Sequence, residues 1–180
     1  MIIKKTFIEK LIIIEPQLFK DDRGFFYESY NKNNFLNIIK TNFVQDNESK
    51  SIKGVIRGLH FQKPPHAQTK LVRCISGKIL DVVVDLRKNS KTFGETFYIE
   101  LSSENNKQLF VPKGFAHGFQ VLTNEAVVNY KVDEYYSPDS YSGIIWNDKD
   151  LLIKWKHDIE PILSKKDLNL ESFKNLKSPF

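Results

Sequence analysis

The stretch that decides the fold runs Gly54-Val-Ile-Arg-Gly-Leu-His60-Phe-Gln62, followed by Gln68-Thr-Lys70 and later by Pro112-Lys-Gly-Phe-Ala-His117-Gly-Phe119. In the two longer stretches, glycine or proline stands beside β-branched or aromatic residues, which is typical of short strands that end in tight turns. Each of these also places one histidine within an apolar run. The region therefore predicts short strands separated by tight turns.

The spacing of these stretches resembles the two sequence motifs of a cupin barrel, which normally supply three histidines and one glutamate to a metal ion. The positions that match this template are Gly54, His60, Gly77, Pro112, Gly114 and His117. Two ligand positions differ, because Gln62 replaces the second histidine and Lys70 replaces the glutamate. A protonated lysine has no lone pair to donate, and its charge repels a cation. The sequence therefore predicts a cupin-type pocket that binds no metal.

Length and composition favour a single domain that spans residues 1–180. Hydrophobic residues make up 41% of the chain, and no apolar run approaches the roughly 18 residues needed to cross a membrane. No apolar stretch followed by a small-residue cleavage site is found near the N-terminus, so secretion is not expected. The single cysteine, Cys74, permits no internal disulfide and suits a reducing compartment. We therefore expect a cytoplasmic protein without a membrane partner.

The net charge of +5 does not by itself indicate nucleic-acid binding. The lysines are scattered along the chain, without a dense basic stripe and without a helix-turn-helix, zinc-finger or RNA-recognition pattern. We therefore expect no nucleic-acid partner. A small-molecule ligand that carries a diphosphate would make use of the same excess of positive charge.

Turn signals at short intervals divide most of the chain into strands. Alternating or β-branched runs occupy residues 1–14 and most of residues 43–136, which indicates an all-β core of jelly-roll type. The runs at 119–122 and 126–130 predict a hairpin across residues 123–125. A short helix capped by Asn33 or Asn34 is expected before the core, and helical periodicity returns from Leu163 onward. The predicted fold is a cupin-type jelly-roll barrel with short helices in its N-terminal part and at its C-terminus.

Three basic side chains belong to the predicted pocket. A histidine within an apolar strand, such as His60, is often only a structural residue. However, Arg57 stands three residues upstream, and Lys70 occupies a position that points inward in a cupin, although a lysine on an edge strand could also lie at the surface. Three basic groups that face one cavity are costly unless an anionic ligand occupies it. An ammonium group in such a cavity can stabilise an enolate or a phosphate oxygen.

Two further residues have both a structural and a catalytic interpretation. Tyr130 alternates with apolar neighbours and could be a core tyrosine, or it could be a general acid, because a phenol can protonate an enolate. Asp167, in Ser164-Lys-Lys-Asp167, matches a helix capping box, but its carboxylate could instead orient a histidine ring. The spacing leaves both alternatives open for each residue.

Motifs that match one known family are distributed over nearly the whole chain. In the first half they are Asp22-Arg-Gly24-Phe-Phe-Tyr-Glu28, Phe43-Val-Gln-Asp-Asn47, Gly54-Val-Ile-Arg-Gly-Leu-His60-Phe-Gln62 and Gln68-Thr-Lys-Leu-Val-Arg73. In the second half they are Asp81-Val-Val-Val-Asp-Leu-Arg87, Thr92-Phe-Gly94, Pro112-Lys-Gly-Phe-Ala-His-Gly-Phe119, Tyr130-Lys131, Tyr135-Tyr-Ser-Pro138, Trp146-Asn-Asp148 and Leu163-Ser-Lys-Lys-Asp167. Together they resemble the dTDP-4-dehydrorhamnose 3,5-epimerase family.

The resemblance implies an isomerase that inverts carbon 3, carbon 5 or both in a nucleotide-linked 4-keto sugar, for the synthesis of surface polysaccharide sugars. It implies a jelly-roll homodimer with shared sites that uses neither a metal nor a nicotinamide cofactor. It assigns the base to His60, the partner of that base to Asp167, the opposing acid to Tyr130 and the enolate-stabilising cation to Lys70. Around the sugar and the phosphates it places Arg57, Gln45, Asn47 and His117. From the neighbouring subunit it brings Arg23, Phe26 and Glu28, and it puts Tyr136 near the nucleotide base.

One departure from the family pattern concerns substrate identity. Tyr141 stands where the family commonly has a glutamate, in the segment after Tyr136 that the resemblance places at the base-binding end. The nucleotide, the sugar and the number of inverted carbons are therefore open. Some relatives act on GDP-linked 4-keto heptoses, and others invert carbon 3 alone.

Two other classes of function compete with epimerisation. In a noncatalytic sugar-nucleotide-binding cupin, His60 and Lys70 would only hold a ligand, but such a protein would not need Tyr130 and Asp167. A metal-dependent dioxygenase or isomerase is disfavoured by Gln62 and Lys70 at two ligand positions.

Overall fold

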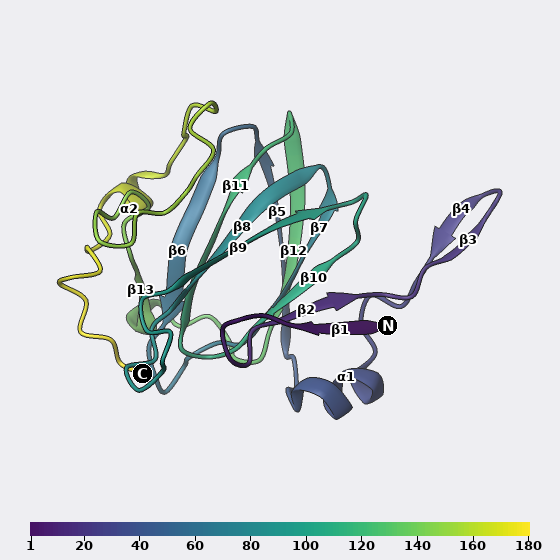
Figure 1. The fold of residues 1–180 in the computed structure, drawn as a ribbon, viewed down its shortest axis with the longest axis horizontal. Coiled ribbons are helices and arrows are strands. Elements are labelled where there is room, and N and C mark those ends of the chain that lie inside the picture. Colours follow the sequence, from purple (N-terminus) through teal and green to yellow (C-terminus); the bar gives the residue numbers. More distant parts are fainter.

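Two antiparallel β-sheets face each other in the computed structural model, which describes residues 1–180 except for the side chain of Asn37 (Figure 1). The six-stranded sheet consists, in spatial order, of β1 (Ile2–Lys5), β2 (Ile12–Glu15), β10 (Gln108–Val111), β7 (Lys70–Ser76), β12 (Glu125–Val132) and β5 (Gln45–Ile52). The five-stranded sheet consists of β13 (Tyr141–Gly143), β6 (Ile56–Gln62), β11 (Phe115–Val121), β8 (Lys78–Asp85) and β9 (Thr96–Ser102). This arrangement confirms the predicted all-β, cupin-type jelly roll.

Side chains from the inner faces of both sheets form the main hydrophobic core. The six-stranded sheet contributes Val72, Cys74 and Val128, and the five-stranded sheet contributes Val83 and Phe119. All of these side chains are buried. Burial of apolar area of this kind is the main favourable contribution to folding. The polar cavity described below occupies the part of the interior that these residues do not fill.

Both sheets are also covered on their outer faces. The C-terminal segment packs Trp155 and Phe173 against the five-stranded sheet, in a cluster that includes Val82. Helix α1 (Lys32–Ile39) places Phe35 against Leu71 of the six-stranded sheet. The C-terminal segment therefore lies next to β6, where it can bring residues from the end of the chain to the predicted site (Figure 1).

A small hairpin projects from the body of the molecule. Its strands β3 (Phe19–Asp21) and β4 (Gly24–Phe26) pair with each other and extend away from the two main sheets (Figure 1). Its aromatic side chains are mostly exposed, at 61% for Phe19, 54% for Phe25 and 67% for Phe26. Large apolar side chains gathered on a projecting element are typical of an interaction surface.

The close approach of the paired strands β6 and β11 depends on two glycines. Gly58 has a φ of +125°, and a Cβ atom there would lie 2.5 Å from the Cα atom of Gly118. A Cβ atom at Gly118 would lie 2.6 Å from the carbonyl oxygen of Arg57. Any side chain at these positions would therefore force the strands apart. In this pairing His60 and His117 lie directly opposite each other.

The predicted hairpin across residues 123–125 is wrong, because β11 and β12 belong to different sheets. After β11 the chain stays beside β8, where the N–H of Leu122 donates to the carbonyl of Lys78. The hydroxyl of Thr123 then accepts a hydrogen bond from the N–H of Lys78 and donates to the carbonyl of Glu125. These bonds turn the chain from one sheet into the other, and β12 pairs with β5 and β7 instead.

The helices are short and differ in detail from the prediction. The cap of α1 is Asn31, whose side chain accepts hydrogen bonds from the N–H groups of Asn33 and Asn34, so the prediction of Asn33 or Asn34 as the cap is wrong. Helix α2 covers only Lys165–Leu168, because the chain beyond it is drawn into a β-bridge between Ile144 and Glu171. Within the part of the chain that the structure describes, no helix is long and apolar enough to cross a membrane.

Candidate active site between the two sheets

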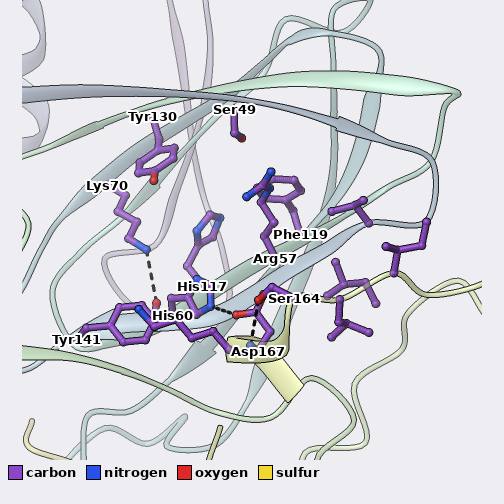
Figure 2. Close-up of a pocket in the computed structure, with 15 residues that line it drawn as sticks. Ser49, Arg57, His60, Lys70, His117, Phe119, Tyr130, Tyr141, Ser164 and Asp167 are labelled. Carbon is purple, nitrogen blue, oxygen red and sulfur yellow. Dashed lines mark hydrogen bonds and ion pairs between the residues drawn. The ribbon is translucent and has the colours of Figure 1, made fainter. Parts of the chain in front are cut away.

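A cavity of about 460 Å³ opens between the two sheets and receives side chains from both of them (Figure 2). Its volume lies in the range of small-molecule sites, roughly 300–1,000 Å³. The residues that line it are Ser49, Val55, Ile56, Arg57, His60, Lys70, His117, Phe119, Tyr130, Tyr141, Ile162, Leu163, Ser164, Lys166 and Asp167. The cavity therefore brings together all four predicted catalytic residues, and Arg57 and His117 from the predicted binding set.

His60 on β6 and Asp167 on α2 form a hydrogen-bonded pair. His60 Nε2 lies 2.5 Å from Asp167 Oδ1, and Asp167 is only 5% exposed. The Ser164 hydroxyl accepts a hydrogen bond from the Asp167 N–H at 3.1 Å and so caps α2. The two interpretations of Asp167 are thus compatible, because its backbone belongs to the cap while its carboxylate contacts the histidine.

The surroundings of this pair favour a neutral imidazole beside a carboxylate. Burial lowers the pKa of His60 below its ordinary value, and the positive charge of Lys70 lowers it further, although Asp167 acts in the opposite direction. Burial tends to raise the pKa of Asp167, but hydrogen bonds from His60 and Ser164 and the positive charge of Arg57 outweigh this and hold that pKa below its usual range. With Nε2–H donating to Asp167, Nδ1 is the ring nitrogen left to accept a proton.

Lys70 on β7 is the partly buried cation of the site. Its Nζ donates to the carbonyl oxygen of His60 at 3.4 Å and lies 6.0 Å from the centre of the Tyr130 ring. Burial lowers the pKa of the Lys70 ammonium to about 8, although the negative charge of Asp81 acts in the opposite direction. The ammonium group is therefore charged near neutral pH and loses its proton as the pH rises past about 8.

Tyr130 on β12 faces the cavity from the six-stranded sheet, whereas His60 stands on the five-stranded sheet. Figure 2 shows the hydroxyl end of Tyr130 directed into the space between them. Burial raises the pKa of the Tyr130 phenol, with a smaller opposing effect from Arg57. The hydroxyl thus keeps its proton at neutral pH and can donate it from the wall opposite the imidazole.

Two polar contacts orient the remaining predicted residues of the cavity. His117 Nε2 lies 2.9 and 3.1 Å from the carboxylate oxygens of Asp81, which is fully buried. Arg57 donates through Nε to the hydroxyl of Ser51 at 3.0 Å. Both contacts restrict the basic side chains before any ligand enters, which reduces the entropy lost on binding.

Tyr141 and Lys166 are cavity residues that were not predicted as such. The sequence places Tyr141, which replaces a glutamate common in the family, at the base-binding end. In the structure the ring centre of Tyr141 instead lies 5.2 Å from that of His60. The Nζ atom of Lys166 lies 3.5 Å from the centre of the Tyr141 ring. No local motif indicates these contacts, because they depend on the pairing of β13 with β6 and on the docking of α2.

Ser49 was also missed, although a signal for it exists. The side chains of β5 alternate, so Ser49 shares the inner face with Gln45 and Asn47. Its hydroxyl is buried without a hydrogen-bond partner among the described residues. The strand alternation that the sequence displays would have been enough to add it to the predicted set.

Several predicted binding residues do not line this cavity. Gln45 and Asn47 lie farther along β5, where Gln45 Nε2 donates to Asn47 Oδ1 at 2.8 Å. Tyr136 is 53% exposed, and its ring centre lies 6.5 Å from that of Tyr141, beside the cavity.

The remaining three belong to the projecting hairpin and the residues after it. Arg23 forms an ion pair with Asp21, and Glu28 accepts a hydrogen bond from Asn31 at 2.9 Å. Like the exposed Phe26, they do not line the cavity of their own chain, and the hairpin projects away from the two main sheets (Figure 1). This position is compatible with the expected contribution to a neighbouring subunit.

Gln62, which occupies a metal-ligand position of the cupin template, has a structural role. Its amide nitrogen donates to the carbonyls of His66 at 2.7 Å and Tyr135 at 3.1 Å, and its oxygen accepts from the N–H of Ser137 at 2.8 Å. The side chain therefore fixes the loop before β13. Within the described part of the chain, no three His, Cys, Asp or Glu side chains are grouped so that they could hold a metal ion.

The cavity contains the elements of proton transfer beside a developing anion. A neutral imidazole oriented by a carboxylate can accept a proton, a partly buried ammonium can stabilise an oxyanion, and a phenol on the opposite wall can return a proton. Comparison with known proteins agrees with this chemistry. The sequence profile of the family dTDP-4-dehydrorhamnose 3,5-epimerase matches residues 5–175.

Individual relatives are similar over almost their whole length. The dTDP-4-dehydrorhamnose 3,5-epimerase of Shigella flexneri is 51% identical over 171 residues, which cover 94% of each chain. The crystal structure of the Bacillus anthracis enzyme of that name, with TDP and PPi bound, is 53% identical with a TM-score of 0.90 and covers 94% of this chain and 98% of its own. The Legionella pneumophila dTDP-6-deoxy-D-glucose-3,5-epimerase in complex with dTDP-4-keto-L-rhamnose is 43% identical, has a TM-score of 0.93 and covers 97% and 93%. The chain therefore belongs to the dTDP-4-dehydrorhamnose 3,5-epimerase family.

Proposed function

We propose that this protein inverts carbons 3 and 5 of a dTDP-linked 4-keto-6-deoxy sugar by removing and returning protons at each carbon. The observation that carries the proposal is the placement of His60 and Tyr130 on facing sheets, with Lys70 beside both of them. A base and an acid on opposite sides of a bound ring are what inversion requires. The family membership supports the same activity.

The reaction follows from the acidity of the substrate. A ketone at carbon 4 acidifies the hydrogens at carbons 3 and 5, because either carbanion delocalises onto the carbonyl oxygen. In the proposed mechanism His60, held by Asp167, removes the hydrogen, and Lys70 stabilises the enolate oxygen. Tyr130 returns a proton to the opposite face of the same carbon, which inverts it. Nothing is oxidised or reduced, so the reaction requires no redox cofactor.

A dTDP sugar and inversion at both carbons are favoured over the alternatives. Relatives near 50% identity carry the name of the 3,5-epimerase, and the Legionella structure was solved with dTDP-4-keto-L-rhamnose. A GDP-linked heptose, inversion at carbon 3 alone and noncatalytic binding are therefore not favoured. In the proposed complex the basic side chains of Arg57 and His117 bind near the sugar and the diphosphate, together with Gln45 and Asn47.

The proposed active form is a homodimer in which each subunit completes the site of the other. The projecting hairpin exposes Phe26, and Arg23 and Glu28 do not line the cavity of their own chain. Exposed aromatic side chains on such an element would be covered in a symmetric dimer. Arg23, Phe26 and Glu28 would then contact the nucleotide sugar of the neighbouring subunit, and Tyr136 would lie near its base.

Incubation with defined substrates in heavy water tests the proposal. With dTDP-4-keto-6-deoxyglucose, deuterium should appear at carbons 3 and 5, and the product should have both centres inverted. A GDP-linked 4-keto sugar should react far more slowly. Deuterium at carbon 3 alone would identify a single epimerisation, and binding without exchange would support the noncatalytic alternative.

A further inference from the structure

The ring of Tyr141 packs beside the imidazole of His60. Their ring centres are 5.2 Å apart at an interplanar angle of 50°. In the pairing of β13 with β6, Tyr141 lies opposite Gln62 and Gly143 lies opposite His60. Since Gly143 has no side chain, Tyr141 is the diagonal cross-strand neighbour that contacts the imidazole, as aromatic side chains in antiparallel pairs can.

Contacts on two other sides hold this ring in place. Lys166 places its Nζ atom 3.5 Å from the ring centre, which is close enough for a cation–π interaction. Gln62, 3% exposed, binds the loop that leads into β13 through its three hydrogen bonds to backbone groups. A ring that is fixed by its loop and by a cation can in turn restrict the histidine beside it.

The uncharged ring of Tyr141 also affects the electrostatic surroundings of His60. The titratable groups that face His60 are Asp167 from α2, Lys70 from β7 and His117 from β11, with Tyr141 from β13. Burial raises the pKa of the Tyr141 phenol, and Asp167 and Tyr136 raise it further, so the residue is uncharged at neutral pH. Asp167 is thus the only carboxylate among the groups that face the imidazole, and a glutamate in place of Tyr141 would add a second.

We propose that Tyr141 is a positioning residue for His60: its ring holds the imidazole against Asp167 and keeps that side of the cavity free of negative charge. For catalysis the inference rests on the proposed function, in which His60 is the base. For the geometry it rests only on the contacts of the ring. Tyr141 therefore has a defined role in this chain although its family commonly has a glutamate at this position.

Titration of His60 tests, without any substrate, whether Tyr141 keeps negative charge away from the imidazole. In protein labelled with ¹³C-histidine, the His60 resonance is assigned by its loss in His60→Asn, which separates it from the other three histidines. Tyr141→Glu should raise the pKa of His60 by about one unit, because a nearby carboxylate favours the imidazolium. Tyr141→Phe should leave the titration unchanged. The matched control is Tyr135→Glu, which adds the same charge at a tyrosine that is 63% exposed and does not line the cavity.

Turnover tests whether the ring of Tyr141 positions the imidazole of His60. Tyr141→Phe keeps the ring and should retain kcat, whereas Tyr141→Leu should lower kcat about tenfold or more with a smaller change in KM, because a displaced base reacts poorly. Thermal unfolding of each variant shows whether it is folded. Should Tyr141→Leu fail to fold, the comparison of Tyr141→Phe with Tyr141→Glu still decides the question, since the glutamate should shift the acidic limb of the kcat/KM profile to higher pH.

The inference is overturned if Tyr141→Glu and Tyr135→Glu give the same His60 titration, or if folded Tyr141→Leu raises KM while kcat is unchanged. The second result would make Tyr141 a residue for substrate binding alone. Failure of the proposed function would look different. The wild-type protein would then show no exchange with any 4-keto sugar, while the titration would still report the relation between His60 and Tyr141.

Discussion

His60 and Asp167 are 107 residues apart in the sequence, yet His60 Nε2 lies 2.5 Å from Asp167 Oδ1. The contact exists because the C-terminal segment folds back over the outer face of the five-stranded sheet and presents α2 to the end of β6. Ser164 caps the helix through the backbone of Asp167, which leaves the carboxylate free for the imidazole. A single short helix thus links the last part of the chain to the proposed base.

Replacement of Asp167 by asparagine should impair catalysis more than stability. Asp167→Asn keeps the backbone cap but favours the wrong imidazole tautomer, so kcat should fall by a factor of about 10²–10⁴. Ser164→Ala provides the comparison, because it removes the cap and should cost about 1 kcal/mol of unfolding free energy. Steady-state kinetics and thermal unfolding of both variants check the prediction. Turnover near the wild-type value in Asp167→Asn would mean that the residue serves only the helix.

The pH dependence of kcat/KM should be bell-shaped. On the acidic side, activity should rise as His60 becomes neutral, with a midpoint below the ordinary value of 6.5, because the site lowers the pKa of this residue. On the basic side, activity should fall near pH 8 as Lys70 loses its proton, since its pKa is lowered to about 8. In Lys70→Arg the remaining activity should no longer fall near pH 8, because a guanidinium stays charged. A basic limb that is unchanged in Lys70→Arg would assign it to another group.

Much of this site could be predicted because its residues follow motif spacing. His60, Lys70 and His117 occupy positions at which the strands of a jelly roll point inward, and the alternation of β12 directs Tyr130 to the same interior. The contacts of Tyr141 could not be predicted, because they result from tertiary pairing of β13 and docking of α2.

The errors in the predicted fold also have local causes. A three-residue turn between two β-branched runs fits a hairpin and a corner between sheets equally well, and only the bonds between Lys78 and Thr123 distinguish them. The predicted position of the α1 cap was wrong because Asn31, Asn33 and Asn34 are all good capping residues, and the sequence alone does not rank them.

Catalysis should not depend on an added metal ion. Lys70 presents a cation where the cupin template has a glutamate, and the amide of Gln62 is occupied by backbone groups. Protein treated with EDTA and passed through a desalting column should therefore keep full activity. Loss of activity on chelation, with recovery on addition of zinc, iron or manganese to stoichiometric amounts, would contradict the prediction.

Hybrid dimers should recover activity from two inactive variants. His60→Asn lacks the base, and Arg23→Ala lacks a residue that the partner is proposed to supply. In a mixed dimer, one site combines the intact His60 of one chain with the intact Arg23 of the other. Random exchange of equal amounts should restore about one-quarter of the wild-type activity, because half of the dimers are hybrids with one intact site each. A fully active monomer in sedimentation experiments, or no recovery despite proven subunit exchange, would argue against shared sites.

Hydrogen exchange in Tyr130→Phe tests most directly whether His60 and Tyr130 act from opposite faces of the sugar ring. The base can still remove a hydrogen and return one to the same face, so substrate recovered from heavy water should carry deuterium. Inverted product should form at about one-hundredth of the wild-type rate or below, because the opposing acid is missing. His60→Asn should show neither exchange nor inversion. Exchange that persists in Tyr130→Phe while inversion is lost is the predicted result, and inversion at the wild-type rate would contradict the account.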